Sequence, residues 1–559
     1  MKKTIKSATQ MSDVSRVCGA DIELGNFIEG AELAGGSGFE ASRALLAEID
    51  GQPKTQSNYL GYWSSGYAAS PSKPVNSYGP AGKGSSQWGY DPLDAARKFL
   101  SENGGCCYLD HAHFELNLPE VTSAFDHAAA WQAMLRIARR ALDSANEGRP
   151  ADRKIKALIN NSDGRGNAGE SYGSHLNFMI SRRAFDNIIG LKKPHHLQSL
   201  ASFQVSSILL TGIGKVGSEN FHAPAAYNIS ARADHFERLH GLPTTFSRPI
   251  VNTRDEPLCG RRGLNDPEAP ARLHVIFFDS ALAPGSALFR VGLMRIFLAQ
   301  LERGLVNPRL LLEDPLAAVH AYSADPTLKA RAELINGERL TLLELQSASL
   351  EDAKRHAAQG VFDGIVPEAG RILALWEDTL VKFERSDWDG VARRGIDWVL
   401  KLTAIERAMD EHPELDWNSP GVKVLDHLYG SLGDDGLYWA YEASGFVEPL
   451  VAPERVAFFE INPPAETRAF ARAHLLRRAA EQSVTVTAVD WDSITFKMRG
   501  RHSWPIYRTL EMADPLGFTE ALAGPIFDSA EDFADLLDGL EALSQHDIPT
   551  QRSLTLIKN

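Results

Sequence analysis

The stretch RVCGADIEL, residues 16–24, is short and typical of a β-strand, and it places acidic side chains at the alternate positions Asp21 and Glu23. Residues two apart on a strand share a face, so both carboxylates point the same way. Two such groups repel each other unless solvent or a cation separates them, and Mg²⁺ prefers oxygen ligands. The stretch therefore predicts a magnesium-binding strand or, taken alone, a solvated strand face.

A second stretch, YLDHAHFE at residues 108–115, offers candidate catalytic groups. On one regular strand, His111, His113 and Glu115 alternate onto one face, and two histidines with a carboxylate could bind zinc. Asp110 then lies on the opposite face between apolar neighbours, where it is a candidate base or nucleophile. Ordinary polar residues at a strand end are the alternative for this stretch by itself.

The loop-forming stretch NNSDGRG, which begins at Asn160, is followed by SYGSHLN from Ser171. Short polar side chains and glycines after an apolar strand suit a loop around a polar ligand, or a plain surface turn. GIGKVG at 212–217 matches GxGxxG, with Asp234 at a suitable distance, but a dinucleotide site needs the motif to open a helix. The residues that follow include Pro and lack a helical period, so we expect no such site; there is also no Walker A sequence.

Arginines recur near the ends of expected strands. Arg232 lies in SARADHFE, Arg254 lies in RPIVNTRDEP, and Arg272 begins an apolar run. A guanidinium binds phosphate or carboxylate through two parallel hydrogen bonds, so these residues are candidate anion clamps. A surface ion pair is the more ordinary role of each one singly.

The composition is that of a soluble globular protein, with 559 residues, 43% hydrophobic and 23% charged, and the length predicts two or three units. A net charge of −14 argues against a general partner among nucleic acids or anionic membranes. No run approaches the roughly 18–20 apolar residues that cross a bilayer, and no apolar signal-peptide core follows the first residues. The four cysteines form no CxxC pair, so we expect a cytoplasmic protein.

The order of predicted elements indicates an α+β fold. Residues 1–15 are typical of a mobile polar tail, and the Gly-, Ser- and Pro-rich residues 51–90 predict a long loop of functional importance or disorder. Strand patterns dominate the first half and helical patterns the second, which does not suit regular βαβ alternation. We expect helices over 91–102, 125–148 and 529–544; strands over 106–116, 155–161, 202–211, 273–279 and 484–498; and mostly helices over 281–480, with a hairpin near 329–343.

In this order, the segments resemble the Pup-ligase/depupylase family from about residue 16 to residue 545. GADIELG resembles the family's G-x-E-x-E strand, YLDHAHFELNLPE its D-H-A-H-P-E segment, and NNSDGRG with SYGSHLN its N-N-x-D-G-x-G-x-S-Y-G-S-H-E-N segment. RPIVNTRDEP, RLHVIFFDSALA, AVHAYSADPTLKA, NPPAETRA and VDWDSITF also have close counterparts. The DHAH segment, the long loop before it and DWDSITF favour the depupylase branch over the ligase branch.

The resemblance implies a glutamine-synthetase-like domain over 16–450, with an antiparallel sheet curved into a cradle and backed by helices, and a small C-terminal domain over 451–559. ATP and Mg²⁺ would lie in the cradle, beside the loop at 51–90. Carried over by position, the metal ligands would be Asp21, Glu23, Glu115 and His175. The cofactor contacts would be Asn161, Asp163, His274 and Trp491, and the catalytic groups Asp110, Arg232 and Arg254.

The implied reaction acts on an amide bond. Asp110 would attack the γ-carbonyl of a terminal Gln or Glu, or activate water to do so, while the arginines and the metal stabilise the carbonyl oxygen. The resemblance thus implies an ATP-dependent amidase or isopeptidase that deamidates or removes a Pup-like small protein. The alternatives are an ATP-consuming carboxylate–amine ligase, a non-catalytic nucleotide-binding relative, and a zinc hydrolase that uses His111 and His113.

Five departures from the family pattern concern the metal site. Asp21 replaces Glu, Leu24 replaces Tyr, Phe114 replaces Pro and Leu176 replaces Glu, and residues 167–170 are inserted. Because metal sites tolerate little misplacement, these changes predict an altered metal geometry or a different small-protein substrate.

Overall fold

The computed structural model describes residues 17–32, 36–49, 97–164, 166–256, 258–260, 269–499 and 504–545. The predicted tail at 1–15 and the predicted loop at 51–90 lie outside these residues. Among the described helices, none has the length and apolar content that crossing a membrane requires.

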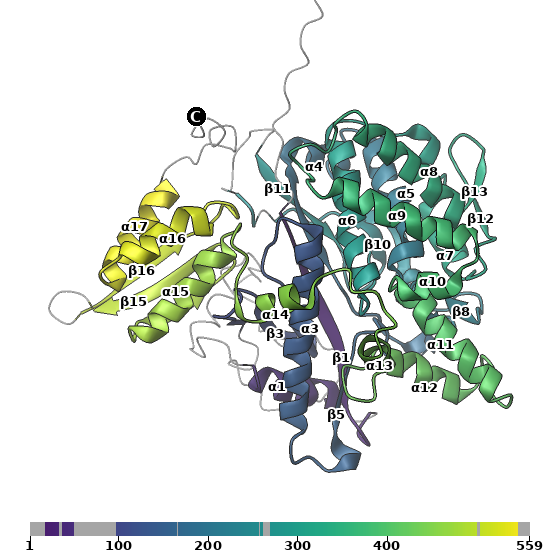
Figure 1. Ribbon diagram of the computed structural model, residues 1–559, viewed down its shortest axis with the longest axis horizontal. Coiled ribbons are helices and arrows are strands. Elements are labelled where there is room, and N and C mark those ends of the chain that lie inside the picture. The colour runs from purple at the N-terminus through teal and green to yellow at the C-terminus, as the bar shows by residue number, and fades with distance from the viewer. Residues whose placement is uncertain are drawn as a thin grey trace, which may run out of the picture.

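A seven-stranded sheet built around β1 (Cys18–Ile28) forms the base of the structure (Figure 1). β1 pairs with β4 and β6 along its first half and with β5 along its second, and every pairing in this sheet is antiparallel. The strand order is β11-β6-β1-β4-β3-β2, and β5 pairs with β1 alone. The other strands are β2 (Lys98–Phe99), β3 (Cys106–Asp110), β4 (His113–Asn117), β5 (Ile155–Leu158), β6 (Leu176–Ser181) and β11 (Pro270–Val275).

The two faces of β1 have different chemistry because side chains alternate along a strand. Ile22 and Leu24 are fully buried in the main hydrophobic core. Asp21 and Glu23 lie on the opposite face, as the sequence predicted. One face of this strand therefore builds the core and the other carries acidic groups.

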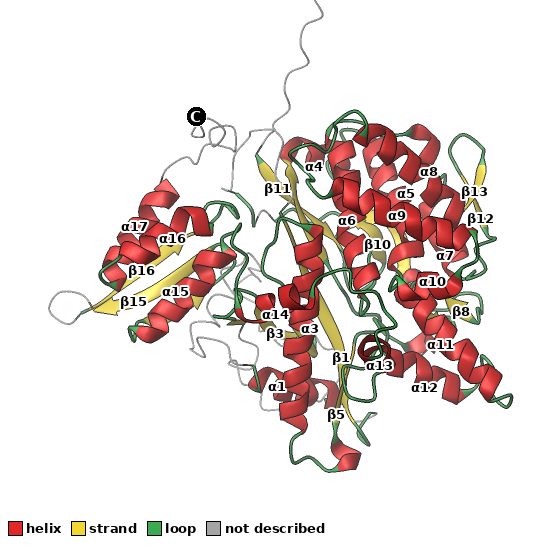
Figure 2. Cartoon of the chain, in the orientation of Figure 1, coloured by secondary structure: helices red, strands yellow, loops and turns green. Residues whose placement is uncertain are grey.

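Helices cover the core face of the sheet (Figures 1 and 2). α3 (Ala124–Asn146) packs against α6 (Pro284–Glu302), which in turn packs against α5 (Pro194–Thr211). The remaining helices of this part are α1 (Ser37–Ala47), α4 (Arg182–Ile188), α7 (Pro315–Ser323), α8 (Leu342–Ala357), α9 (Ala369–Glu384), α10 (Trp388–Arg393), α11 (Asp397–Glu411), α12 (Pro420–Tyr429), α13 (Leu437–Ala443) and α14 (Pro453–Ile461). Short strand pairs complete it: β7 (Lys215–Val216) with β8 (Tyr227–Asn228), β9 (Phe236–Gly241) with β10 (Arg248–Asn252), and β12 (Arg331–Glu333) with β13 (Arg339–Thr341).

The C-terminal segment forms a second hydrophobic core, seen at the left of Figure 1 in yellow and pale green. Its sheet and helices are β14 (Thr485–Val489), β15 (Ser493–Arg499), β16 (Pro505–Glu511), α15 (Ala469–Glu481), α16 (Glu520–Ser529) and α17 (Phe533–Gln545). Phe99 of β2 and Cys106 of β3 belong to this core, so the edge of the large sheet is built into it. The domain boundary at 450/451 stays a prediction.

Three predicted elements were wrong. The described end of the helix expected over 91–102 is strand β2, because Lys98 and Phe99 pair with β3. The strand expected over 202–211 lies inside α5, where nearly every side chain is buried, so the amphipathic period that identifies a helix is absent. The single strand expected over 106–116 is the hairpin β3–β4.

Other expectations were confirmed. α3 occupies the helix predicted over 125–148, and β12–β13 form the hairpin near 329–343. Gly212–Gly217 ends α5 and enters β7 instead of opening a helix, which excludes a dinucleotide-binding turn there. The α+β class, with an antiparallel sheet backed by helices, is confirmed.

A buried ion cluster joins the large sheet to the C-terminal segment. Glu120 accepts from Arg468 Nε at 2.8 Å and from Arg472 Nη2 at 2.5 Å. Burial by itself raises the pKa of Glu120, but the two guanidinium groups lower it to about 2. Glu120 is therefore ionised in the folded protein, and its charge is matched by two cations.

Replacing Glu120 with Gln is expected to destabilise the protein by about 3 kcal/mol, because two buried arginines lose their counter-charge. Since the pKa of Glu120 falls from 4.5 to about 2 on folding, its contribution is complete above about pH 4.5 and is lost as the pH falls toward 2. Urea unfolding of both proteins between pH 3 and pH 7 measures this difference. Equal midpoints across that range would contradict the assignment.

Candidate active site

The hairpin β3–β4 determines where Asp110 points. His111 and Ala112 form its turn with φ values of 47° and 74°, the left-handed conformation that a two-residue type I′ turn requires at both positions. Asp110 consequently pairs with His113, and Tyr108 pairs with Glu115. The prediction that Asp110 lies on the face opposite Glu115 was wrong, because the chain reverses at His111 instead of continuing as one strand.

Three carboxylates from three strands converge at this hairpin. Glu23 of β1 lies directly opposite Glu115 of β4, and Asp110 of β3 completes the group. One carboxylate oxygen from each residue lies within 4.8 Å of the other two. We call Glu23, Asp110 and Glu115 the acidic cluster.

Burial and mutual repulsion make it unfavourable to ionise two members of the acidic cluster, Glu115 and Asp110. Burial raises the pKa of Glu115 well above its ordinary value, and the charges of Asp21, Asp110 and Glu23 raise it further. Partial burial and the charge of Glu23 also raise the pKa of Asp110, although nearby histidines oppose that rise. Asp110 keeps 40% of its side chain exposed, so it is the member that a substrate can reach.

Glu23 differs from its two neighbours. Burial raises its pKa, but the hydrogen bond from His113 and the charge of His175 outweigh burial, so the pKa of Glu23 lies below its ordinary value. Gly173 also donates its backbone N–H to Glu23 at 2.5 Å. His113 lies with Nδ1 3.5 Å from Glu23 and is thus its ionic partner. The converging ligand atoms are all carboxylate oxygens, a set that favours Mg²⁺ over zinc.

The loop predicted to surround a ligand is held by its own side chains. Asn161, in the left-handed conformation, donates to the Tyr172 carbonyl at 3.1 Å and to Ser280 Oγ at 3.0 Å, and it accepts from the Ser280 N–H at 2.6 Å. Gly25 lets this loop approach β1, because a Cβ there would lie 2.5 Å from the Tyr172 hydroxyl. The amide of Asn161 is engaged by Tyr172 of the loop and by Ser280, so it holds in place the loop whose Gly173 contacts Glu23.

The end of the same loop engages Asp21. His175 donates its backbone N–H to Asp21 Oδ1 at 2.6 Å, and its ring Nδ1 lies 3.2 Å from the same oxygen. Its ring also packs against His274 at 5.2 Å between centroids. Asp21 and His175, both predicted metal ligands, are therefore in direct contact beside the acidic cluster.

Buried cations face this acidic side. Arg232 is fully buried and donates from Nη1 to the Phe278 carbonyl at 3.1 Å, while its Nε and Nη2 find no hydrogen-bond partner among the described residues. Arg290 has the same two nitrogens without a hydrogen-bond partner within the described chain, but its guanidinium lies over the Trp131 ring, 4.0 Å from the ring centre. Burial and the charge of Arg232 lower the pKa of Arg248 to about 9. Buried donors without acceptors are rare, and an anion would satisfy them.

His274 adds a further unsatisfied nitrogen. Its Nδ1 lies 3.0 Å from Asn177 Oδ1, whereas Nε2 has no partner in the described part of the chain. Burial lowers the pKa of His274 well below its ordinary value, and the charges of Arg272, His175 and Arg254 lower it further. The imidazole is therefore neutral, and Arg254, which follows β10, acts on it electrostatically.

Asp163 and Trp491 are the two remaining predicted cofactor contacts. Asp163 is in the loop after β5, where its N–H donates to the Glu170 carbonyl at 3.2 Å. Trp491 is in the C-terminal sheet, packed against Phe99 at 5.2 Å and beneath the guanidinium of Arg472 at 4.8 Å. Their roles as cofactor contacts stay predictions.

Three residues at the site were not singled out from the sequence. Arg248 opens the stretch RPIVNTRDEP, in which only Arg254 was chosen. Arg290 stands in an otherwise apolar helical stretch, SALFRVGLM, and an isolated arginine there was the available signal. Tyr108, whose hydroxyl donates to Glu115, gave no signal because its role depends on the hairpin.

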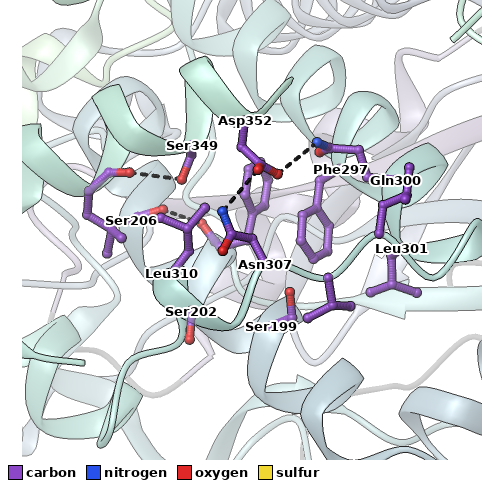
Figure 3. Close-up of a pocket in the computed structure, with 14 residues that line it drawn as sticks. Ser199, Ser202, Ser206, Phe297, Gln300, Leu301, Asn307, Leu310, Ser349 and Asp352 are labelled. Atoms are coloured by element: carbon purple, nitrogen blue, oxygen red, sulfur yellow. Dashed lines mark hydrogen bonds between the residues drawn. The ribbon is translucent and has the colours of Figure 1, made fainter. Parts of the chain in front are cut away.

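A separate pocket lies among α5, α6 and α8 (Figure 3). The hydroxyls of Ser202 and Ser349 donate to backbone carbonyls of their own helices. Asp352 accepts from Gln300 Nε2 and Asn307 Nδ2, as the dashed lines show. These polar groups are satisfied internally, and none of the predicted site residues lines the pocket, so it is not the candidate active site.

Comparison with known proteins identifies the family. Residues 16–495 match the family model described as Pup-ligase protein. A depupylase of Acidothermus cellulolyticus is 32% identical over 507 residues, which cover 84% of this chain and 94% of that protein. A Pup deamidase/depupylase of Mycolicibacterium smegmatis is 33% identical, with 80% of this chain and 84% of that protein covered. A Pup–protein ligase of Acidimicrobium ferrooxidans is 34% identical, with 74% and 86% covered.

Solved structures agree with the fold. The Pup ligase PafA in complex with Pup superposes with a TM-score of 0.70 at 24% identity, over 97% of this chain and 94% of that chain. PafA in complex with ADP superposes with a TM-score of 0.65 at 25% identity, over 81% and 91%. Both superpositions show that the chain has the fold of the Pup ligase PafA. The chain belongs to the Pup-ligase family and is an enzyme of that family.

Adding Mg²⁺ is expected to raise the melting temperature of the wild-type protein at pH 8, because the cation relieves repulsion in the acidic cluster. At a Mg²⁺ concentration near one hundred times its Kd, binding should raise the free energy of unfolding by about 2.7 kcal/mol. Since the pKa of Glu115 is raised on folding, the metal-free protein should lose stability as the pH rises above 4.5. Glu115→Gln should lose both that pH dependence and the response to Mg²⁺.

Scanning calorimetry with and without Mg²⁺ measures these effects. Asp434→Asn is the control, because Asp434 lies in the loop between α12 and α13 and its side chain is 91% exposed. An equal response of Glu115→Gln and the control would remove Glu115 from the metal site.

Proposed function

We propose that this protein is an ATP-dependent amidase or isopeptidase that deamidates Pup, or a Pup-like small protein, and removes it from lysine side chains. The observation that carries the proposal is the convergence of Asp110, in its DHAH hairpin, with Glu23 and Glu115. Relatives named depupylase or Pup deamidase/depupylase match over 80% or more of this chain and support the hydrolytic direction. The proposal places the enzyme in the cytoplasm, and its four buried, unpaired cysteines support a reducing compartment.

The cofactor of this proposal is Mg-ATP. The carboxylate donor set suits Mg²⁺, and the unpaired Nε and Nη2 of Arg232 suit phosphate oxygens. The neutral His274 ring carries its proton on Nδ1, beside Asn177 Oδ1, so its Nε2 suits a hydrogen-bond donor of the ligand. Asp21, Glu23, Glu115 and His175 would hold the metal, which when bound supplies positive charge. Asn161, Asp163, His274 and Trp491 would contact the nucleotide.

Asp110 performs the central chemistry of the proposal. Its carboxylate either attacks the γ-carbonyl carbon of the terminal Gln or isopeptide-linked Glu, or takes a proton from a water that attacks it. In both routes the C–N bond breaks and ammonia or the lysine amine leaves with a proton; in the first route water then hydrolyses the acyl-aspartate and restores Asp110. A raised pKa makes that carboxylate a stronger base, and 40% exposure lets the carbonyl approach. Arg232 and Arg254 stabilise negative charge that develops on the carbonyl oxygen.

The departures from the family pattern bear less on this chemistry than the sequence alone suggested. Leu24, Phe114 and Leu176 are all fully buried in the hydrophobic core. Each neighbours a site residue in sequence and therefore points to the other face of its strand. Asp21 is the substituted position on the site face, and His175 compensates by binding its carboxylate directly.

The same site suits the reverse reaction, so a Pup–lysine ligase is the second candidate. The observation that favours it is a Pup–protein ligase relative with 34% identity. A ligase consumes one ATP for each bond formed, whereas the proposed hydrolase requires bound nucleotide without steady release of ADP. Incubation with ATP, Mg²⁺ and a Pup–lysine conjugate, read by mass spectrometry together with ADP release, separates the two.

Asp110→Asn is expected to lower cleavage of the conjugate at least about 100-fold, because the neutral amide neither attacks a carbonyl nor accepts a proton. Mg-ATP affinity, measured by calorimetry, should stay within a few-fold of wild type, since Asp110 is the exposed edge of the cluster. Asp434→Asn serves as the matched control. Cleavage by Asp110→Asn at the wild-type rate would contradict the catalytic assignment, and an equal loss of cleavage in Asp434→Asn would show that the effect is nonspecific.

A further inference from the structure

Glu115, the most buried carboxylate of the acidic cluster, is oriented by its neighbours on the hairpin. The hydroxyl of Tyr108 donates to Glu115 Oε1 across the β3–β4 pair, and Asn117 Nδ2 donates to the same oxygen at 3.1 Å. Two donors on one oxygen limit the rotation of the carboxylate. The position of Glu115 therefore depends on the position of the Tyr108 ring.

The Tyr108 ring is in turn covered by a cation. The guanidinium of Arg97 lies 5.2 Å from the ring centre, a distance at which cations are attracted to aromatic faces. Arg97 Nη1 also donates to Asp490 Oδ1 at 3.2 Å, with side chains only 11% and 5% exposed. Arg97 thus connects Tyr108 to the C-terminal sheet.

Asp490 is a rigid anchor for this connection. It directly follows β14; its N–H donates to the Ser493 carbonyl at 2.8 Å, and its Oδ1 accepts from the Trp491 N–H at 2.8 Å. The Trp491 ring meets Phe99 of β2 edge-on at 5.2 Å. The turn of the C-terminal hairpin is therefore locked against the strand that neighbours β3.

We infer that the contacts Asp490–Arg97–Tyr108–Glu115 form a relay through which the C-terminal sheet positions a divalent-cation ligand in the acidic cluster. Arg97 and Tyr108 are positioning residues in this arrangement, and Asp490 of the VDWDSITF stretch is their anchor. The inference rests on the proposed function only in taking the acidic cluster as the metal site.

Stability alone does not account for these groups. Apolar contacts of Phe99, Cys106 and Trp491 already join the two parts of the structure. A buried ion pair adds little net stability over apolar residues of similar volume, because both charges must be desolvated. The Arg97–Asp490 pair is better explained by its effect on orientation, because it fixes the Tyr108 ring and, through that ring, Glu115.

Titration of the full-length protein with Mn²⁺ alone, followed by calorimetry and by electron paramagnetic resonance of free Mn²⁺, tests the relay. Tyr108→Phe removes one hydroxyl and Asp490→Asn removes one charge, and each should weaken Mn²⁺ binding about tenfold, as is typical for partners of metal ligands. The fold-loss of Mn²⁺ affinity in the double variant Tyr108→Phe/Asp490→Asn should be much smaller than the product of the two single fold-losses, because both changes break the same relay. Arg97→Lys, which keeps the charge, should show a smaller loss than Arg97→Met.

Tyr322→Phe is the matched control, since it also deletes a buried tyrosine hydroxyl, one that donates to the Leu340 carbonyl at 2.8 Å. Wild-type Mn²⁺ affinity in Asp490→Asn would overturn the inference, and so would independent, multiplicative losses in the double variant. Losses that follow the melting temperature, and that Tyr322→Phe shares, would also overturn it. If Asp490→Asn does not fold, the two Arg97 variants decide: wild-type Mn²⁺ affinity in Arg97→Met would overturn the inference, and a larger loss in Arg97→Met than in Arg97→Lys would support it.

The relay and the proposed function fail in different ways. Absence of Mn²⁺ binding in the wild type would remove the metal site and the relay with it. The expected Mn²⁺ pattern without cleavage of a Pup–lysine conjugate would support the relay and contradict only the hydrolytic function.

Discussion

Mutual repulsion among closely spaced carboxylates is the constraint on which the arrangement of this site depends. Glu23, Asp110 and Glu115 bring oxygens within 4.8 Å of one another, and Asp21 adds its charge from the same face of β1. Such a group is stable only where protons, cations or hydrogen-bond donors compensate it. Its persistence in a folded protein therefore calls for surroundings that supply those partners.

The surroundings meet this demand unevenly. Glu23 receives a backbone N–H and the imidazole of His113, so it is ionised, whereas Glu115 receives neutral donors and its pKa is raised. The buried guanidinium of Arg232 balances part of the charge at longer range. The unsatisfied donors of Arg232, close enough to feel the charges of Glu23 and Asp21, give the site two halves, one suited to a cation and one to an anion. A metal–nucleotide complex carries both charges.

The C-terminal segment takes part in this arrangement as well as in stability. Arg468 and Arg472 hold Glu120, while Arg97 carries the influence of Asp490 to the hairpin that bears Asp110 and Glu115. A small unit attached only through apolar packing could shift without consequence for the chemistry. Attachment through oriented charged contacts makes the geometry of the acidic cluster sensitive to that unit.

Local physics made part of this structure predictable from the sequence by itself. Alternation along a strand placed Asp21 and Glu23 on one face, the period of residues 125–148 indicated α3, and the ordered motifs indicated the family and its α+β fold. Only the tertiary structure decided that Asp110 joins Glu115, because two left-handed residues at His111 and Ala112 reverse the chain there. It also decided that the run at 202–211 is helical, since burial on all sides removes the period that distinguishes a helix. Arg248, Arg290 and Tyr108 acquire their roles through neighbours distant in the chain, and such neighbours are brought together by packing that no local pattern contains.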